Sequence, residues 1–134
     1  MPILNAMCDL IDDGKEDKIA GNLILLPTRE LAVQVETVLK NLLKALESVY
    51  EKKITTCTIS GGFAAEKQIR ILEKKPKIIV ATIGRLWDLL QNHKSEAIRD
   101  LAGINYLVLD EIDRIIDLGQ MKELEGVLKF IENP

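Results

Sequence analysis

Short apolar runs alternate with amphipathic stretches along this chain, and the alternation predicts a series of strands and helices. Four runs are rich in aliphatic or β-branched residues and have the length of strands, at residues 23–26, 54–60, 77–82 and 106–109. The first run is uniformly apolar and is stopped by Pro27, as expected of a strand that is buried on both faces of a sheet.

Helical spacing fills the intervals between these runs. A long amphipathic helix is expected over residues 28–49, where one stripe carries Leu31, Val35, Val38, Leu42 and Leu46. We expect shorter helices at residues 3–11, 64–74 and 84–92, some helix within a linker at residues 98–105, and a last helix from Met121 onward. Residues 12–22 are polar, contain two glycines and are expected to form a loop.

Strands that alternate with helices indicate an α/β fold, in which a parallel sheet carries helices on both faces. Ligands of such sheets bind beyond the carboxyl ends of the strands. Each expected strand is followed here by a distinctive segment, and these segments are Pro27-Thr28-Arg29, Ser60-Gly61-Gly62, Thr82-Ile83-Gly84-Arg85 and Asp110-Glu111-Ile112-Asp113.

Composition narrows the class of protein. The chain has 134 residues, of which 47% are hydrophobic and only 4% aromatic, so one domain with an aliphatic core is expected. Two cysteines and one histidine argue against a disulfide scaffold and against a metal centre built on imidazole. Because no membrane span or signal peptide is visible, we expect an intracellular protein with no membrane partner. The net charge of −3 argues against nucleic-acid binding through bulk charge, but a local binding face stays open.

The first three strand ends share the features of a phosphate site. Free N–H groups at a helix start favour an anion, the glycines let a ligand backbone approach, and Arg29 and Arg85 add positive charge. Side by side, they would suit a polyanionic chain held through its backbone. In the alternative interpretation the glycines only end strands, and Thr28 and Thr82 only cap helices.

The fourth strand end is acidic. An aspartate after an apolar strand, here Asp110, is typical of a residue that holds Mg²⁺ largely through water, and Glu111 beside it could act as general base on an attacking water. The alternative is a solvated acidic turn that caps the next helix.

In their order and intervals, the four segments resemble motifs of the DEAD-box ATP-dependent RNA helicases. Residues 26–32, Leu-Pro-Thr-Arg-Glu-Leu-Ala, resemble motif Ia, and Gly61-Gly62 resembles the double-glycine motif. Residues 82–85 resemble motif Ib, and residues 108–114 resemble motif II. The resemblance covers nearly the whole chain. It implies a partial RecA-like sheet of the P-loop NTPase type, in which the motif II strand lies beside the motif Ia strand, followed by the motif Ib and double-glycine strands.

The resemblance also implies a role for each residue at the strand ends. Contacts to the RNA sugar-phosphate backbone are implied for Pro27, Thr28, Arg29, Gly61, Gly62, Thr82, Gly84 and Arg85. ATP and Mg²⁺ are the implied cofactors of Asp110 and Glu111, with Asp110 on the metal, and Asp113 is implied to couple the nucleotide site to other motifs.

Two residues depart from the family pattern. Ile83 stands where the family has a proline, which would preset the start of a helix. Ile112 stands where the family has an alanine, and its extra bulk is expected to fit against the sheet.

The sequence contains no adenine-recognition motif, no phosphate-binding loop that ends in Gly-Lys-Thr, and no Ser-Ala-Thr motif. We therefore expect residues 1–134 to be an internal piece of the first lobe of an RNA helicase, unable to hydrolyse ATP by itself. Such a piece would leave a sheet edge open at Tyr106–Leu109, an expected site of self-association. Residues 84–90 and 119–128 look most like nucleolar helicases of ribosome assembly, which implies a nucleolar location.

Two other hypotheses remain. The chain could be a non-catalytic module that binds RNA or protein through the same face. It could also be an unrelated small α/β domain such as a phosphoacceptor receiver, although receivers cluster their acids near the first strand and here the acidic group follows the last.

Overall fold

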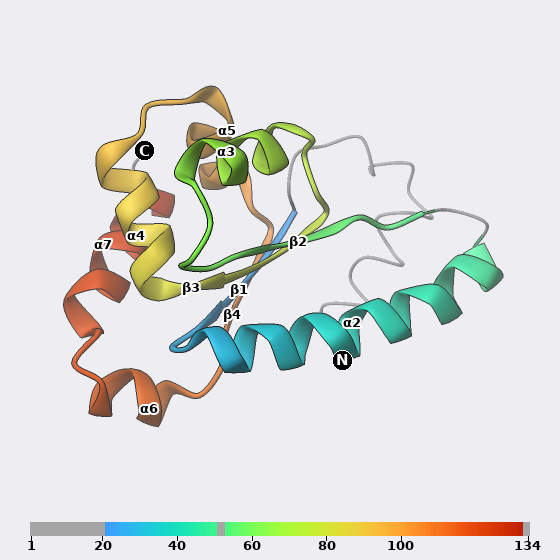
Figure 1. The fold of residues 1–134 in the computed structure, drawn as a ribbon, viewed down its shortest axis with the longest axis horizontal. Coiled ribbons are helices and arrows are strands. Elements are labelled where there is room, and N and C mark those ends of the chain that lie inside the picture. The colour runs from blue at the N-terminus through green and yellow to red at the C-terminus, as the bar shows by residue number, and fades with distance from the viewer. Residues whose placement is uncertain (1–20, 51–52, 133–134) are drawn as a thin grey trace.

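The computed structural model describes residues 21–50 and 53–132, and these residues form a parallel sheet with helices on both faces (Figure 1). Its strands are β1 (Asn22–Leu26), β2 (Thr56–Ile59), β3 (Ile78–Thr82) and β4 (Tyr106–Leu109). Their order across the sheet is β2-β3-β1-β4, and every pairing is parallel. The α/β prediction and the strand order implied by the resemblance are both confirmed.

The two central strands explain the uniformly apolar runs in the sequence. Every residue of β1 and β3 is buried, because helices cover the sheet above and below them. The register pairs Leu26 with Thr82 and Leu25 with Leu109, so neighbouring strands end level with one another. The register therefore places the segments that follow these strands side by side.

Among the described residues, one face of the sheet is covered by the long helix α2 (Arg29–Tyr50). Ala32, Leu39 and Leu43 of α2 are buried against Ile24 and Val80 of the sheet. The predicted stripe was partly wrong, since Val38 is 52% and Leu42 39% exposed. The predicted Leu31, Val35 and Leu46 do pack against the sheet, and between them Leu39 and Leu43 are buried in place of Val38 and Leu42.

The opposite face carries the remaining helices, as Figure 1 shows. These are α3 (Ala65–Glu73), α4 (Ile83–Asn92), α5 (Glu96–Arg99) with the 3₁₀ turn Asp100–Gly103, and α7 (Met121–Glu132). They enclose the larger core cluster, to which Leu86, Leu89, Leu101 and Val127 contribute. The helical linker predicted at residues 98–105 is confirmed in part by α5 and the 3₁₀ turn.

Between β4 and α7 lies a short helix, α6 (Ile112–Asp117), that the sequence pattern did not predict. It lies beyond the end of β4, and the chain leaves it through Gly119, whose φ of +69° is the left-handed conformation that glycine favours. The helix predicted at residues 3–11 lies outside the described residues, as does all of the predicted loop except Gly21 and Asn22.

Several smaller expectations can also be checked. Cys57 is buried in the core, and burial together with the nearby Glu36 carboxylate raises the pKa of its thiol to about 12. Cys8 lies outside the described residues. Within the described ranges, no helix is both long and apolar enough to cross a membrane.

The contact between α4 and α7 yields a first prediction. Gly126 of α7 lies against the indole ring of Trp87, and a methyl group there would overlap the ring. Gly126→Ala should therefore lower the free energy of unfolding by about 1–2 kcal/mol, although alanine is the better helix former. Urea titration followed by the fluorescence of Trp87, the single tryptophan, measures the change.

Gly84→Ala is the matched control, because a methyl group at Gly84 of α4 would meet nothing within 4 Å. Equal stability of the Gly126→Ala chain and the unsubstituted chain would contradict the close packing of α7 on Trp87.

Candidate functional site

The four segments singled out in the sequence lie along one edge of the sheet. All strands are parallel, and the register pairs Ile59 with Ala81 and Leu26 with Thr82 near the strand ends. Across this edge the order is the double-glycine segment, the segment around Gly84, the segment around Arg29 and finally the acidic segment. The predicted juxtaposition of the candidate residues is thus confirmed at the level of the backbone.

The segment after β1 turns directly into α2. The hydroxyl of Thr28 accepts a hydrogen bond from the N–H of Leu31 at 3.4 Å, so the capping interpretation of Thr28 holds, with a long bond. Pro27 is buried, and its carbonyl accepts a hydrogen bond of 3.2 Å from the side-chain amide of Gln120. Arg29 is exposed and extends outward from the first turn of α2.

Arg29 lies against the double-glycine segment two strands away. A Cβ at Gly62 would lie only 2.9 Å from Nη1 of Arg29, so the guanidinium lies directly against this residue. The φ of +93° at Gly62 is what favours glycine there. The guanidinium also lies over the ring of Phe63, with Cζ 5.6 Å from the ring centroid. The motif Ia and double-glycine segments therefore present one joint surface.

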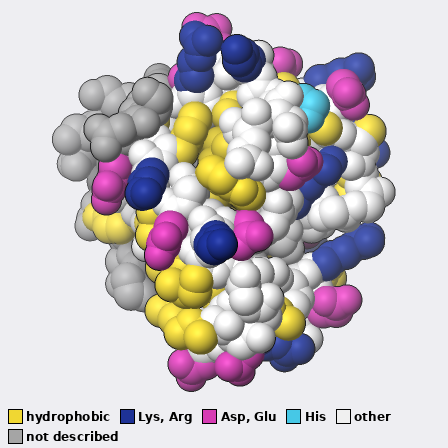
Figure 2. All heavy atoms as spheres, turned by 90° about the vertical axis from the view of Figure 1, so that its left-hand side faces the viewer, with side chains coloured by type: hydrophobic (Ala, Val, Ile, Leu, Met, Phe, Trp, Pro, Cys, Tyr) yellow, Lys and Arg dark blue, Asp and Glu magenta, His cyan; other side chains and the backbone are white. Residues whose placement is uncertain are grey.

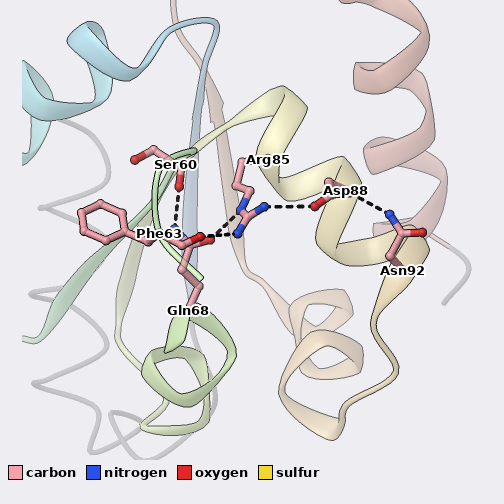
Figure 3. Close-up of polar contacts among 6 residues, drawn as sticks. All are labelled: Ser60, Phe63, Gln68, Arg85, Asp88 and Asn92. Carbon is pink, nitrogen blue, oxygen red and sulfur yellow. Dashed lines mark hydrogen bonds and ion pairs between the residues drawn. The ribbon is translucent and has the colours of Figure 1, made fainter. Parts of the chain in front are cut away.

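Arg85 is partly buried and is held by a network of hydrogen bonds (Figure 3). Its Nε donates to Oε1 of Gln68 at 2.8 Å, its Nη2 to the carbonyl of Phe63 at 2.6 Å, and its Nη1 to Oδ2 of Asp88 at 3.1 Å. Gln68, only 1% exposed, also donates to the carbonyl of Ser60 at 2.6 Å. Arg85 and Gln68 thus clamp the double-glycine segment at Ser60 and at Phe63.

Sequence reasoning placed Arg85 among the RNA contacts and missed this clamp. The three-residue spacing from Arg85 to Asp88 on one helix was a visible signal for an ion pair. Gln68 gave no signal, because its partners come from other elements and only the packing of α3 brings them within reach.

The remaining candidates of this row differ in their surroundings. Thr82 is 7% exposed and makes no capping bond with its side chain, so the capping interpretation is wrong for this residue. Methyl groups at Gly61 or Gly84 would meet nothing within 4 Å, and both residues are exposed. No internal contact therefore requires glycine at these two positions, and both backbones are open to a ligand from outside.

The acidic segment is exposed and starts α6. Oδ1 of Asp110 accepts a hydrogen bond of 3.0 Å from the N–H of Glu111, and Glu111 itself has a left-handed φ of 58°. That conformation is uncommon for a residue with a side chain. Asp113 follows in the first turn of α6. The expectation for Ile112 is wrong: its side chain is 48% exposed because α6 points away from the sheet.

These carboxylates fit a magnesium ion held through water, but they do not fit a complete nucleotide site. In the part of the chain that the structure describes, no three metal-binding side chains converge. Nor does the sequence hold the Gly-Lys-Thr loop that would cradle phosphates. Mg²⁺ bound with ATP would neutralise phosphate charge. Asp110 would hold the ion, and Glu111, the next residue, would act as general base on a water.

Known proteins resemble this chain along nearly its whole length. The family model described as "DEAD/DEAH box helicase" matches residues 1–134. The chain is 39% identical over 120 residues to "DEAD-box ATP-dependent RNA helicase 13" of Oryza sativa subsp. japonica, covering 90% of this chain and 14% of that protein. It is 39% identical over 138 residues to "ATP-dependent RNA helicase mak-5" of Neurospora crassa, covering 100% of this chain and 16% of that protein.

A solved structure shows the same fold. The DEAD-box helicase Mss116 bound to ssRNA and UDP-BeF superposes with a TM-score of 0.76 at 26% identity, over 97% of this chain and 25% of that one. The chain thus spans about a sixth or less of the two curated relatives, at 14% and 16% of their lengths.

The Arg85 clamp yields the second prediction. Gln68→Leu would leave the carbonyl of Ser60 and the Nε of Arg85 without partners, so the free energy of unfolding should fall by about 1–3 kcal/mol. Gln34→Leu on the exposed side of α2 is the control and should change stability little. Thermal unfolding followed by circular dichroism measures both, and equal midpoints for the two variants would refute the clamp.

Proposed function

This chain belongs to the DEAD/DEAH box helicase family, and from that premise we propose that its strand-end edge binds the sugar-phosphate backbone of single-stranded RNA. Binding of this kind is independent of base sequence, because phosphate contacts position a strand without reading it. The proposed contacts are Pro27, Thr28, Arg29, Gly61, Gly62, Thr82 and Gly84.

The open backbone at the two exposed glycines carries the proposal. Gly61 and Gly84 lie at neighbouring strand ends, and the space around each is unfilled by the protein. A phosphate can approach a main-chain N–H closely only where no side chain intervenes. Arg29, held over Gly62, supplies the positive charge beside them. In this proposal Arg85 acts through the double-glycine loop that it clamps.

We assign the ATP-dependent part of the family's chemistry to the acidic segment at residues 110–113. We propose that residues 1–134 work as part of a helicase ATP-binding domain, in which Asp110 holds Mg²⁺, Glu111 is the general base and Asp113 couples the nucleotide site to other motifs. Hydrolysis requires β- and γ-phosphates that are cradled and neutralised. We therefore expect this chain by itself to bind RNA without turning over ATP. The nucleolar role in ribosome assembly stays a prediction.

The RNA proposal predicts a specific effect of Arg29. Arg29→Ala should raise the Kd for single-stranded RNA about tenfold, since a charge-assisted contact is lost. The slope of log Kd against log salt should fall by about 0.7. Gly84→Ala should also weaken binding while leaving stability unchanged or raised, because its methyl group meets only the ligand. Fluorescence anisotropy of a labelled RNA at low salt measures both.

Arg70→Ala is the matched control, as it removes the same charge from the last turn of α3. If Arg29→Ala and Arg70→Ala weaken binding equally, the binding comes from general charge attraction. That result would contradict the assignment of RNA contacts to this edge. Each titration is repeated with Mg²⁺ and ATP. A Kd that drops when nucleotide is added would contradict the expectation that the chain lacks a working nucleotide site.

We also propose self-association through β4. Within the described residues β4 pairs only with β1, so its outer edge is unpaired, and Tyr106 is 46% and Val108 37% exposed. Sedimentation velocity should show dimers that form at high concentration and disappear in the Val108→Lys chain. Val38→Lys, at a residue 52% exposed on α2, is the control and should still dimerise. A monomeric unsubstituted chain at all concentrations would refute this proposal.

A further inference from the structure

A pocket of about 400 Å³ lies beside the outer strand β2, next to the proposed RNA edge. α2 contributes Val33 and Glu36 to its lining, and α3 contributes Lys67 and Ile71. Phe63, the residue after the double glycine, lines it as well. The pocket is therefore continuous with the segment that is proposed to hold a phosphate, although no motif residue apart from Arg29 and Ser60 lines it.

Phe63 is exposed at this pocket in an arrangement suited to a nucleotide. Phe63 is 47% exposed, and its ring points away from Arg85, which holds the Phe63 backbone through a hydrogen bond (Figure 3). Nζ of Lys67 lies 5.5 Å from the ring centroid, and Cζ of Arg29 lies 5.6 Å from it. Two cations thus converge on one exposed aromatic ring.

The charge around the pocket favours an anionic ligand. Within the described residues neither Arg29 nor Lys67 forms an ion pair, so both charges are available to phosphate. Burial opposes the ionisation of Glu36, but hydrogen bonds with Lys40 and Thr58 outweigh it and hold the pKa of its carboxyl below the usual value. Its negative charge is neutralised by Lys40, at 2.6 Å.

We propose that Phe63 and Lys67 form an additional RNA subsite, in which one base of the bound strand stacks on the Phe63 ring over the β2 pocket and Lys67 contacts its phosphate. This inference rests on the proposed function, since the strand must already be held at Arg29 and the double glycine. An aromatic platform beside cations is the usual means of holding single strands, because every base has a flat face. Val33 and Ile71 form apolar walls of the pocket. These walls suit the flat face of a base, whereas they offer a phosphate no hydrogen-bond donor.

The test compares two probes of equal length and charge: a single-stranded oligouridine and the same ribose-phosphate chain without bases. Phe63→Ala should raise the Kd for oligouridine about fivefold or more and leave the Kd for the abasic strand unchanged. Phe63→Tyr keeps the ring and should retain the affinity. Lys67→Gln should weaken both probes and lower the salt slope by about 0.7.

Two controls accompany these variants. Val49→Ala removes an apolar side chain, 72% exposed, near the end of α2 that lies away from Arg29. Lys74→Gln removes a charge at the far end of α3. Both should leave the two Kd values unchanged, and circular dichroism melts verify that every variant is folded.

The outcomes distinguish a failure of the base-stacking subsite from a failure of the proposed RNA-binding edge. If Phe63→Ala leaves oligouridine binding unchanged, or weakens both probes equally, the base-stacking subsite is wrong while the Arg29 edge stands. If the unsubstituted chain binds neither probe, the proposed function fails and the subsite fails with it. An unchanged RNA affinity together with a Phe63-dependent affinity for an extended peptide would assign the β2 edge to strand addition instead.

Discussion

Parallel pairing of β1 with both of its neighbours is the constraint on which the rest of the structure depends. β1 and β3 are apolar along their whole length, and they can be buried only if helices cover both faces of the sheet. Chain connections between parallel strands must cross over, so every strand ends at the same edge. The register of Leu26 opposite Thr82 then brings Thr28 and Gly84, 56 residues apart in the sequence, to adjacent positions.

Phe63 connects the two arginines of this edge, which have different tasks. Its carbonyl accepts from Arg85, whose guanidinium is committed to holding the loop. Its ring lies against the guanidinium of Arg29, an exposed residue. A chain with a net charge of −3 can therefore present a local anion site, because only Arg29, Lys67 and the open backbones need to face the strand. Figure 2, which shows the face built on α4, α6 and α7, has basic and acidic side chains interspersed, with hydrophobic side chains both in its upper half and at the lower end where α6 lies.

Local pattern predicted most of the fold, and tertiary packing decided the rest. The apolar runs located all four strands within two residues at either end. For β1 and β3 the reason is that strands buried on both faces leave few polar interruptions. The strand order was available only through the family resemblance, since periodicity carries no information on which strands pair. The contacts of α2 were predicted correctly at Leu31, Val35 and Leu46. At the other two positions Leu39 and Leu43 face the sheet instead of Val38 and Leu42. The site residues were found by their motifs. Gln68 and Lys67 were missed, since their roles come from the loop that α3 packs against.

The acidic end and the RNA edge are joined by one further contact. Gln120 follows α6, the helix that begins at the strained backbone of Glu111, and its amide donates to the carbonyl of Pro27. Its own side-chain oxygen is buried without a partner among the described residues, so this contact leaves one polar group unsatisfied. The positions of α6 and of the turn before Arg29 are therefore not independent. The bond from Gln120 to Pro27 thus links the residue after α6 directly to the start of the proposed RNA-binding row.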